Sequence, residues 1–187
     1  MSVPEATVTA VLAHAAARPP LLGEGRLVCV DGPAGSGKTT LAAALAAATG
    51  ARVLTMDDHY EGWQGLGDAP ARIRDEILAP LAAGLPGFYR RYDWERREFA
   101  ELHAVEPSDL LVIEGVGSGS RELAAYRATL VWVTADADQR LERGLARDGE
   151  AARDDWLRWM DDEQAHFTTH GTADAADLRV DASGALL

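Results

Sequence analysis

The chain has 187 residues, of which 47% are hydrophobic and 26% are charged. This length suffices to bury one hydrophobic core, and the composition excludes a disordered or fibrous protein, so we expect a single globular domain over residues 1–187. The net charge of -12 would repel the backbone of duplex nucleic acid, so we expect no nucleic-acid partner.

The cysteine count and the N-terminal sequence indicate the compartment. Cys29 is the only cysteine, so no intramolecular disulfide can form, as is usual in a reducing compartment. The N-terminus lacks a basic segment followed by an apolar one, and no apolar run approaches the roughly 18 residues that a membrane helix requires. We therefore expect a cytoplasmic protein without a membrane partner.

Helices and strands alternate along most of the chain. In chain order, the patterns predict a helix over 4–18, a strand over 26–31, a helix from 38 to 50, a strand over 52–56, a helix over 71–84, strands over 109–115 and 129–135, and a short strand over 177–180. This alternation predicts an α/β protein with three layers, in which helices cover both faces of a five-stranded, mainly parallel sheet. The stretch 84–106 is rich in aromatic residues and arginine, and we expect it to form an inserted element that faces the substrate.

A glycine-rich segment lies between the first predicted strand and the helix after it. Residues 32–39, GPAGSGKT, satisfy the pattern GxxxxGK[ST] of a phosphate-binding loop in full. Gly35 and Gly37 allow the backbone to curl so that successive amides point into one concavity, and the start of the helix adds its positive end. Lys38 would reach the β- and γ-phosphates of ATP, and the hydroxyl of Thr39 would bind magnesium. The expected nucleotide ligands are Gly32, Ala34, Gly35, Ser36, Gly37, Lys38, Thr39 and Thr40.

Acidic residues end two further predicted strands. Asp57 and Asp58 follow the strand 52–56, at the carboxyl edge of the sheet where the phosphate loop also lies. An aspartate at this edge can accept the proton of an attacking hydroxyl or hold the metal; without the loop, a solvated or helix-capping pair would be the simpler interpretation. Glu114 ends the run 109–115 and would act on magnesium directly or through water, unless it is an ordinary strand-end residue.

Five motifs occur in an order that resembles the uridine kinase family of P-loop kinases, whose relatives act on cytidine, pantothenate and phosphoribulose. They are GPAGSGKT, MDDHY at 56–60, RYDW at 91–94, VIEGV at 112–116 and DADQRLERGLARD at 136–148. The resemblance spans residues 26–167 and implies a P-loop kinase fold with a helical lid over about 136–155. It also implies ATP and magnesium as cofactors. The implied phosphate acceptor is a hydroxyl of a small molecule, with a nucleoside such as uridine as the first expectation.

The same resemblance implies roles for residues near the acceptor. Asp57 would be the base that takes the proton from the sugar hydroxyl, beside Asp58, and Tyr60 and Tyr92 would line the nucleoside pocket. The family usually has a histidine a few residues beyond the tyrosine of the YD motif, and Arg97 or Glu98 stands near that place here. The loop 61–68 also differs from the usual segment, and it offers Asp68 as a candidate ribose contact.

On the lid, the resemblance implies that arginines close over the triphosphate. Arg140 would bind the nucleotide, Arg143 and Arg147 would take part in catalysis, and Arg153 is a further candidate. Positions 140, 143 and 147 are spaced i, i+3 and i+7, so they share one helix face and could clamp phosphates. A solvated helix with local acidic partners is the alternative for any one of these arginines.

Two other interpretations of the whole chain remain open. The protein could be a kinase of another small metabolite, such as pantothenate, a sugar or nicotinamide riboside, or a switch that holds ATP without a small acceptor. His166 and His170 share a helix face but lack the other residues of a metal site, which favours a structural role. Relatives in the family often assemble, so a homo-oligomer is compatible with the resemblance.

Overall fold

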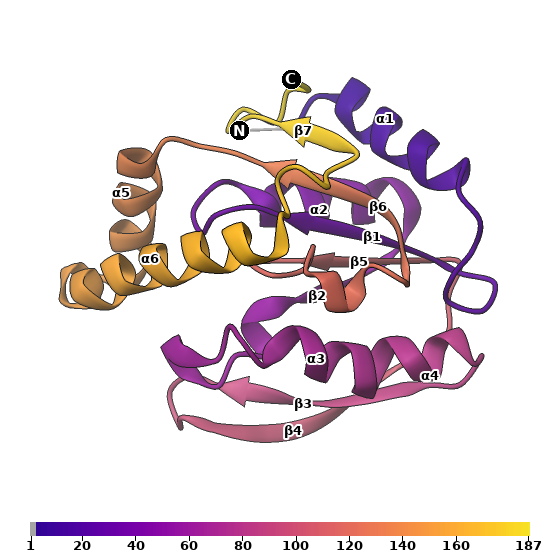
Figure 1. Ribbon diagram of the computed structural model, residues 1–187, viewed down its shortest axis with the longest axis horizontal. Helices are drawn as coiled ribbons and strands as arrows, with labels where there is room; N and C mark the ends of the chain where they lie inside the picture. The colour runs from indigo at the N-terminus through magenta and orange to yellow at the C-terminus, as the bar shows by residue number, and fades with distance from the viewer. Residues whose placement is uncertain (1–2) are drawn as a thin grey trace.

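The computed structural model describes residues 3–187, and its centre is a five-stranded sheet (Figure 1). The strands lie in the order β2-β5-β1-β6-β7, and every neighbouring pair is parallel. Their bounds are Arg26–Asp31 for β1, Arg52–Thr55 for β2, Leu110–Glu114 for β5, Arg127–Val133 for β6 and Leu178–Val180 for β7. The five-stranded sheet expected from the alternation is therefore confirmed.

Alternate side chains of the strands divide the core into two parts, one on each face of the sheet. Valines of β1, β5 and β6 pack with α1 (Glu5–Ala16) and α2 (Lys38–Thr49) on one face. Leucine, isoleucine and cysteine side chains of the same strands pack on the other face, against the helices that follow β2 and against α6 (Arg153–His170). Strands buried on both faces read as continuous apolar runs, which is why the sequence alone predicts three layers.

The helix expected over 71–84 begins at Ala69 and contains a wider turn. It consists of α3 (Ala69–Ile73), the π turn η3 (Arg74–Leu78) and α4 (Ala79–Ala82). Pro80 gives a physical reason, because proline has no N–H and its ring clashes with the carbonyl four residues earlier in a regular α-helix. The wider turn just before it accommodates this defect.

The inserted stretch forms a two-stranded antiparallel ribbon outside the main sheet. β3 (Gly87–Asp93) pairs with β4 (Glu98–Val105), and the ribbon packs against η3 and α4. It lies at the bottom of the molecule in Figure 1, beyond α3 and α4. The ribbon is therefore a layer of its own. It reaches the sheet's carboxyl edge through Tyr89 of β3, which contacts Asp58, and through Trp94 in its turn, which contacts Asp57.

The segment that the resemblance implied as a lid contains two helices joined by a tight corner. These are α5 (Ala137–Asp148) and the start of α6. At Gly144 of α5, a Cβ would lie 2.4 Å from the indole ring of Trp156, so the helices touch closely there. Short 3-10 turns occupy other connections: η1 (Met56–Asp58), η2 (Gly62–Gln64), η4 (Arg121–Leu123) and η5 (Glu150–Ala152). Across residues 3–187, no helix combines the length and the apolar character needed to cross a membrane.

Candidate active site

The glycine-rich loop between β1 and α2 has the backbone that its sequence predicts. Gly32, Gly35 and Gly37 have φ angles of 140°, 77° and 107°, which residues with a side chain rarely adopt. At Gly35 a Cβ would lie 2.8 Å from the carbonyl oxygen of Arg140, so close packing requires glycine as well. At Gly37 a Cβ would meet no atom within 4 Å, because this part of the loop borders open space.

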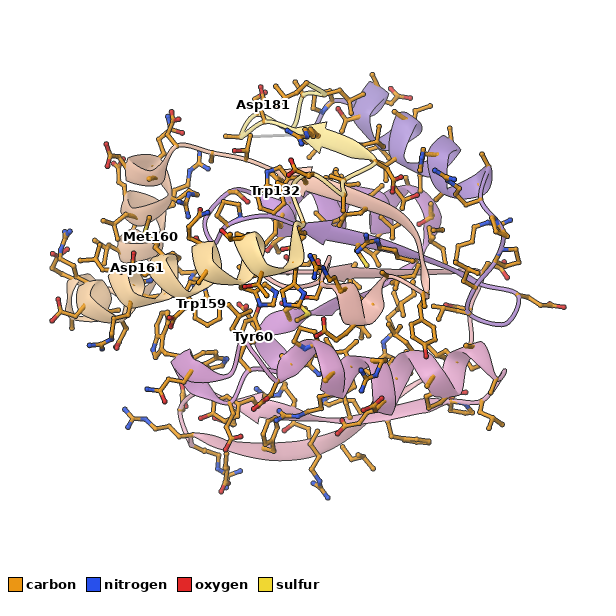
Figure 2. All side chains as sticks on the ribbon, viewed as in Figure 1. Tyr60, Trp132, Trp159, Met160, Asp161 and Asp181 are labelled. Atoms are coloured by element: carbon orange, nitrogen blue, oxygen red, sulfur yellow. The ribbon has the colours of Figure 1, made fainter. Side chains whose placement is uncertain are left out.

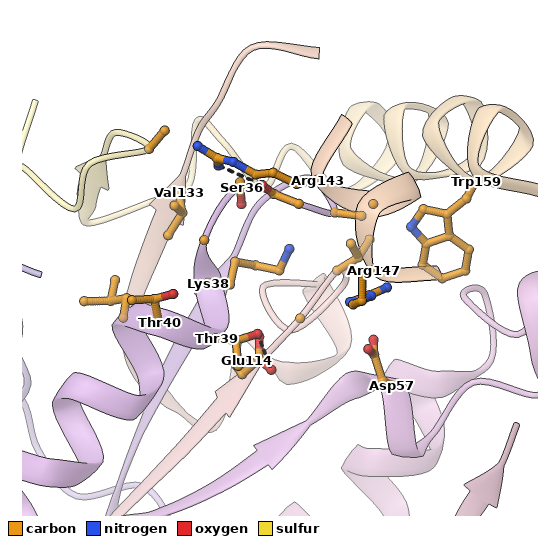
Figure 3. A pocket seen from close by; sticks show the side chains of 18 of the residues that line it. Ser36, Lys38, Thr39, Thr40, Asp57, Glu114, Val133, Arg143, Arg147 and Trp159 are labelled. Carbon is orange, nitrogen blue, oxygen red and sulfur yellow. Dashed lines mark hydrogen bonds between the residues drawn. The ribbon is translucent and has the colours of Figure 1, made fainter. Parts of the chain in front are cut away.

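A cleft of about 850 Å³ lies above this loop, at the carboxyl edge of the sheet (Figure 3). Its loop half is formed by residues 34–40 and Glu114. Its tryptophan half is formed by Asp57 and by four indole rings: Trp63, Trp94, Trp156 and Trp159. The turn 181–184 after β7 also lines the cleft, and no sequence pattern singled it out.

Lys38 is the first residue of α2 and is almost fully buried beneath the loop. Its Nζ donates a hydrogen bond to the carbonyl oxygen of Pro33, at 2.9 Å. Burial lowers the pKa of Lys38, while the nearby carboxylates of Glu114 and Asp31 act in the opposite direction. Lys38 thus supplies positive charge inside the curve of the loop, as the motif predicts.

Thr39 and Glu114 bring two oxygen atoms together beside Lys38. The Thr39 hydroxyl donates to Oε1 of Glu114 at 3.2 Å, across the boundary between α2 and the end of β5 (Figure 3). Burial raises the pKa of Glu114, and the charge of Lys38 opposes that rise. A hydroxyl and a carboxylate are the ligands that a hard cation such as magnesium takes in proteins.

Asp57 lies in η1, immediately after β2, and its carboxylate faces the cleft near Arg147 (Figure 3). Asp57 is an exposed residue, but it lines the cleft, where neighbouring protein atoms replace part of the water around its side chain. This partial desolvation raises the pKa of Asp57, with Lys38 and Arg147 opposing the rise. Since β2 and β5 are neighbours in the sheet, Asp57 and Glu114 lie at the ends of adjacent strands.

Two of the predicted lid arginines line the cleft. Arg143 donates from Nη1 to the carbonyl oxygen of Gly35 at 3.1 Å. Arg147 pairs with Asp148 at 2.7 Å, and its guanidinium lies 5.7 Å from the ring centre of Trp156. Both come from α5, so this helix borders the loop half at Arg143 and the tryptophan half at Arg147.

The other two lid arginines lie elsewhere. Arg140 does not line the cleft; its Nη1 donates to Glu163 at 2.7 Å, beneath the loop. Arg153 pairs with Glu150 on the surface. The spacing predicted that the three arginines of α5 share one face. Arg143 and Arg147 do face the cleft, whereas Arg140 points to the protein interior.

Of the residues expected to bind the acceptor, one lines the cleft and the others lie outside its lining. Tyr60 lines the cleft but is 1% exposed, and its hydroxyl donates to the carbonyl oxygen of Val116 at 2.7 Å. Four others lie outside the cleft lining. Asp58 accepts from the Tyr89 hydroxyl, Tyr92 is buried under the ribbon turn, and Asp68 and Arg97 are exposed in loops.

The tryptophans are the main feature that the sequence analysis missed. Trp63 lies at the middle of the cluster, with ring centres 5.7 Å from Trp94, 6.0 Å from Trp159 and 6.3 Å from Trp156. Trp94 donates from its indole nitrogen to the Asp57 carbonyl at 3.0 Å, and is 38% exposed. Figure 2 shows Trp159 descending from α6 toward Tyr60. Trp156 and Trp159 are both buried in the protein interior and line the cleft.

A second glycine-rich turn, 115–120, follows Glu114 and is held by a buried aspartate. Asp31 accepts hydrogen bonds from the amides of Gly32, Gly117 and Gly119, at 2.7, 3.0 and 2.7 Å. Burial raises the pKa of Asp31 to about 6, although these amides oppose the rise. Asp31 therefore ties the start of the phosphate loop to the turn after β5, and no sequence pattern indicated this role.

His166 and His170 have structural contacts. The His166 ring lies 2.9 Å from the Ser120 hydroxyl, and Nδ1 of His170 accepts from the Arg121 amide. Within residues 3–187, no group of three or more His, Cys, Asp or Glu side chains is arranged to hold a metal ion. A divalent cation at Thr39 and Glu114 would therefore need further ligands from a bound phosphate or water.

Comparisons with known proteins identify a family and a fold. Residues 28–168 match the model of a family described as AAA domain. No curated protein matches the sequence closely enough to count as a relative.

Solved structures with the same fold include two bacterial proteins. A possible uridine kinase from Bacillus stearothermophilus is 20% identical, with a TM-score of 0.67, and the match covers 93% of this chain and 97% of the other. A candidate fructose transport system kinase from Silicibacter sp. TM1040 is 22% identical, with a TM-score of 0.63, and covers 86% of this chain and 93% of the other. The fold is therefore that of P-loop kinases.

Proposed function

The chain belongs to the AAA domain family, and from this premise we propose that it transfers the γ-phosphate of ATP to a hydroxyl of a small molecule, in the first place a nucleoside. The observation that carries the proposal is that one cleft contains both a phosphate loop and a carboxylate, Asp57, aimed into the same space. A protein that only holds a nucleotide has no need of such a base.

The loop half fits a magnesium nucleotide. Successive amides of the loop, with the positive end of α2, suit the phosphate oxygens, and Lys38 would exchange its bond to Pro33 for one to the β- and γ-phosphates. Thr39 and Glu114 are the residues that would hold magnesium, directly or through water. When bound, magnesium would neutralise part of the charge on the phosphates.

Asp57 is suited to accept the proton of the acceptor hydroxyl. Its raised pKa makes it a stronger base than an aspartate surrounded by water alone, while the nearby Lys38 and Arg147 favour its ionised form. Its Oδ atoms would orient the hydroxyl for in-line attack and take up its proton. Arg143 and Arg147 would neutralise charge on the transferring group and exclude water from above.

The tryptophan half favours an acceptor that carries a planar ring. Indole rings stack on nucleobases with a stabilisation of about 1–3 kcal/mol for each base. A sugar or an extended chain would gain less from the exposed ring of Trp94 and the half-buried ring of Trp63, which Trp156 and Trp159 back from the interior. The solved structures do not separate these classes, since one is described as a possible uridine kinase and the other as a candidate fructose transport system kinase.

The proposal is tested by a panel of acceptors in an assay of ADP release. We expect uridine, cytidine or nicotinamide riboside to raise ADP release from MgATP, and fructose and pantothenate to raise it less. Stimulation by fructose alone would favour a sugar kinase. ATP binding without stimulation by any acceptor would favour a nucleotide switch and overturn the proposal.

A further inference from the structure

Glu163 is a buried carboxylate that the proposed reaction does not use. It lies on α6 and is 2% exposed. Its Oε2 accepts a hydrogen bond from the amide of Ala34 in the phosphate loop at 2.8 Å, and its Oε1 accepts one from Nη1 of Arg140 in α5 at 2.7 Å. One side chain thus joins the loop to two helices that are distant from it in sequence.

The outer turn of the loop also touches α5 directly. The Arg140 guanidinium lies 3.4 Å from the carbonyl oxygen of Ala34, and Arg143 donates to the carbonyl oxygen of Gly35. The backbone of Arg140 packs so closely on Gly35 that no Cβ would fit there. Within the loop, the Ser36 amide donates to the Pro33 carbonyl oxygen at 3.2 Å and closes a turn around Ala34 and Gly35. These two residues are also fixed from outside, by α5 and by Glu163.

Neither a gain in stability nor its charge explains why a carboxylate is buried at position 163. Burying a carboxylate costs free energy, and a buried ion pair often contributes little net stability. Its negative charge also acts on Lys38 and would oppose an anionic nucleotide in the loop. A carboxylate in this position is useful if it sets the shape of the loop.

We propose that Glu163 is a positioning residue, which holds the outer turn of the phosphate loop so that the amides after it keep their common concavity for the nucleotide. This inference rests on the proposed function, because it concerns the nucleotide that the loop would bind. Glu163 acts through Ala34 and Arg140, and its carboxylate does not line the cleft.

Two substitutions separate the effect of Glu163 on the shape of the loop from the effect of its negative charge. Glu163→Gln removes the charge and turns an amide NH₂ toward either Ala34 or Arg140, both of which donate. Glu163→Asp keeps the charge but is one methylene too short to reach both partners. If only charge mattered, the first variant would bind a nucleotide more tightly and the second would bind it unchanged. A positioning role predicts weaker binding in both.

The measurement is calorimetric titration with MgADP, which needs no acceptor and no turnover. We expect the dissociation constant to rise about tenfold in both variants, as for the loss of about one buried hydrogen bond. In turnover assays, the KM for ATP should rise while the KM for the acceptor stays unchanged. Asp162→Asn is the matched control, since it removes the same formal charge from an exposed neighbour on α6 and should leave MgADP binding unchanged.

Two outcomes would overturn the inference, and only one of them would also overturn the proposed function. If wild type binds MgADP and both Glu163 variants bind it as tightly or more tightly, Glu163 has no positioning role and the proposed function stands. If wild type binds no MgADP, the proposed function falls together with the inference. A thermal melt of each variant shows whether it is folded, and the charge-conserving Glu163→Asp provides the answer where Glu163→Gln does not fold.

Discussion

The two halves of the cleft differ in how they are built. The loop half comes from one continuous segment, residues 34–40, with Glu114 at the end of the neighbouring strand. The tryptophan half comes from distant segments: η1, η2, the turn of the ribbon and α6. A loop of consecutive amides can be recognised in a sequence, whereas a cluster of indole rings gathered from separate segments cannot. The halves should therefore respond differently to substitution.

The largest effect is expected at Lys38. Lys38→Ala removes the charge that compensates the β- and γ-phosphates, and we expect the transfer rate to fall by about a hundredfold to a thousandfold, as for loss of one stabilising group. The fold should persist, because Lys38 makes one hydrogen bond to its own loop. Steady-state kinetics with a thermal melt as control test this, and turnover equal to wild type would remove the loop half from the mechanism.

Asp57→Asn tests the link between the halves. We expect the turnover number to fall by about a hundredfold or more, because the acceptor loses its base. Wild-type turnover should also decline as the pH falls through the raised pKa of Asp57, since protonation removes the base. MgADP affinity should not change. A variant with normal turnover and a normal pH profile would exclude Asp57 as the base.

Trp94→Leu addresses the tryptophan half alone. Trp94 is the most exposed of the four rings and is hydrogen bonded beside Asp57. We expect about a tenfold rise in the acceptor KM, within the range of one base-stacking contact, and an unchanged KM for ATP. Trp132→Leu is the control, because Trp132 packs on Phe167 and does not line the cleft. Equal effects of the two substitutions would mean that the cluster only packs.

The smallest effect is expected at Asp31, which supports the loop half from below. In the unfolded chain its pKa is near 3.8, and in the fold it is about 6. Between these values the folded protein binds more protons than the unfolded chain, so Asp31 makes stability fall as pH rises. Asp31→Asn removes this pH dependence of stability, because the amide side chain does not titrate. When melting temperatures are measured from pH 4 to 7, wild type should lose stability relative to the variant as the pH rises. A difference in melting temperature that stays constant over this range would contradict the raised pKa of Asp31.

The sequence predicted the layers and the loop half for a physical reason. Buried parallel strands and a glycine loop leave local patterns, and residues 26–39 contain both. The pattern could not place Tyr92, Asp68 or Arg97 relative to the cleft, because their positions depend on how a ribbon and a loop fold over the sheet. The role of Glu163 could not be predicted for the same reason, because its partner Ala34 is 129 residues away in the sequence.

We propose that one cleft brings a phosphate donor and a hydroxyl acceptor together at Asp57. The most direct test is mass spectrometry of the products formed from MgATP and uridine by wild type and by Asp57→Asn. We predict that wild type forms uridine monophosphate and ADP, while the variant binds MgADP equally well and forms almost none. Equal product from both proteins, or MgADP binding by a wild type that phosphorylates no acceptor in the panel, would contradict the claim.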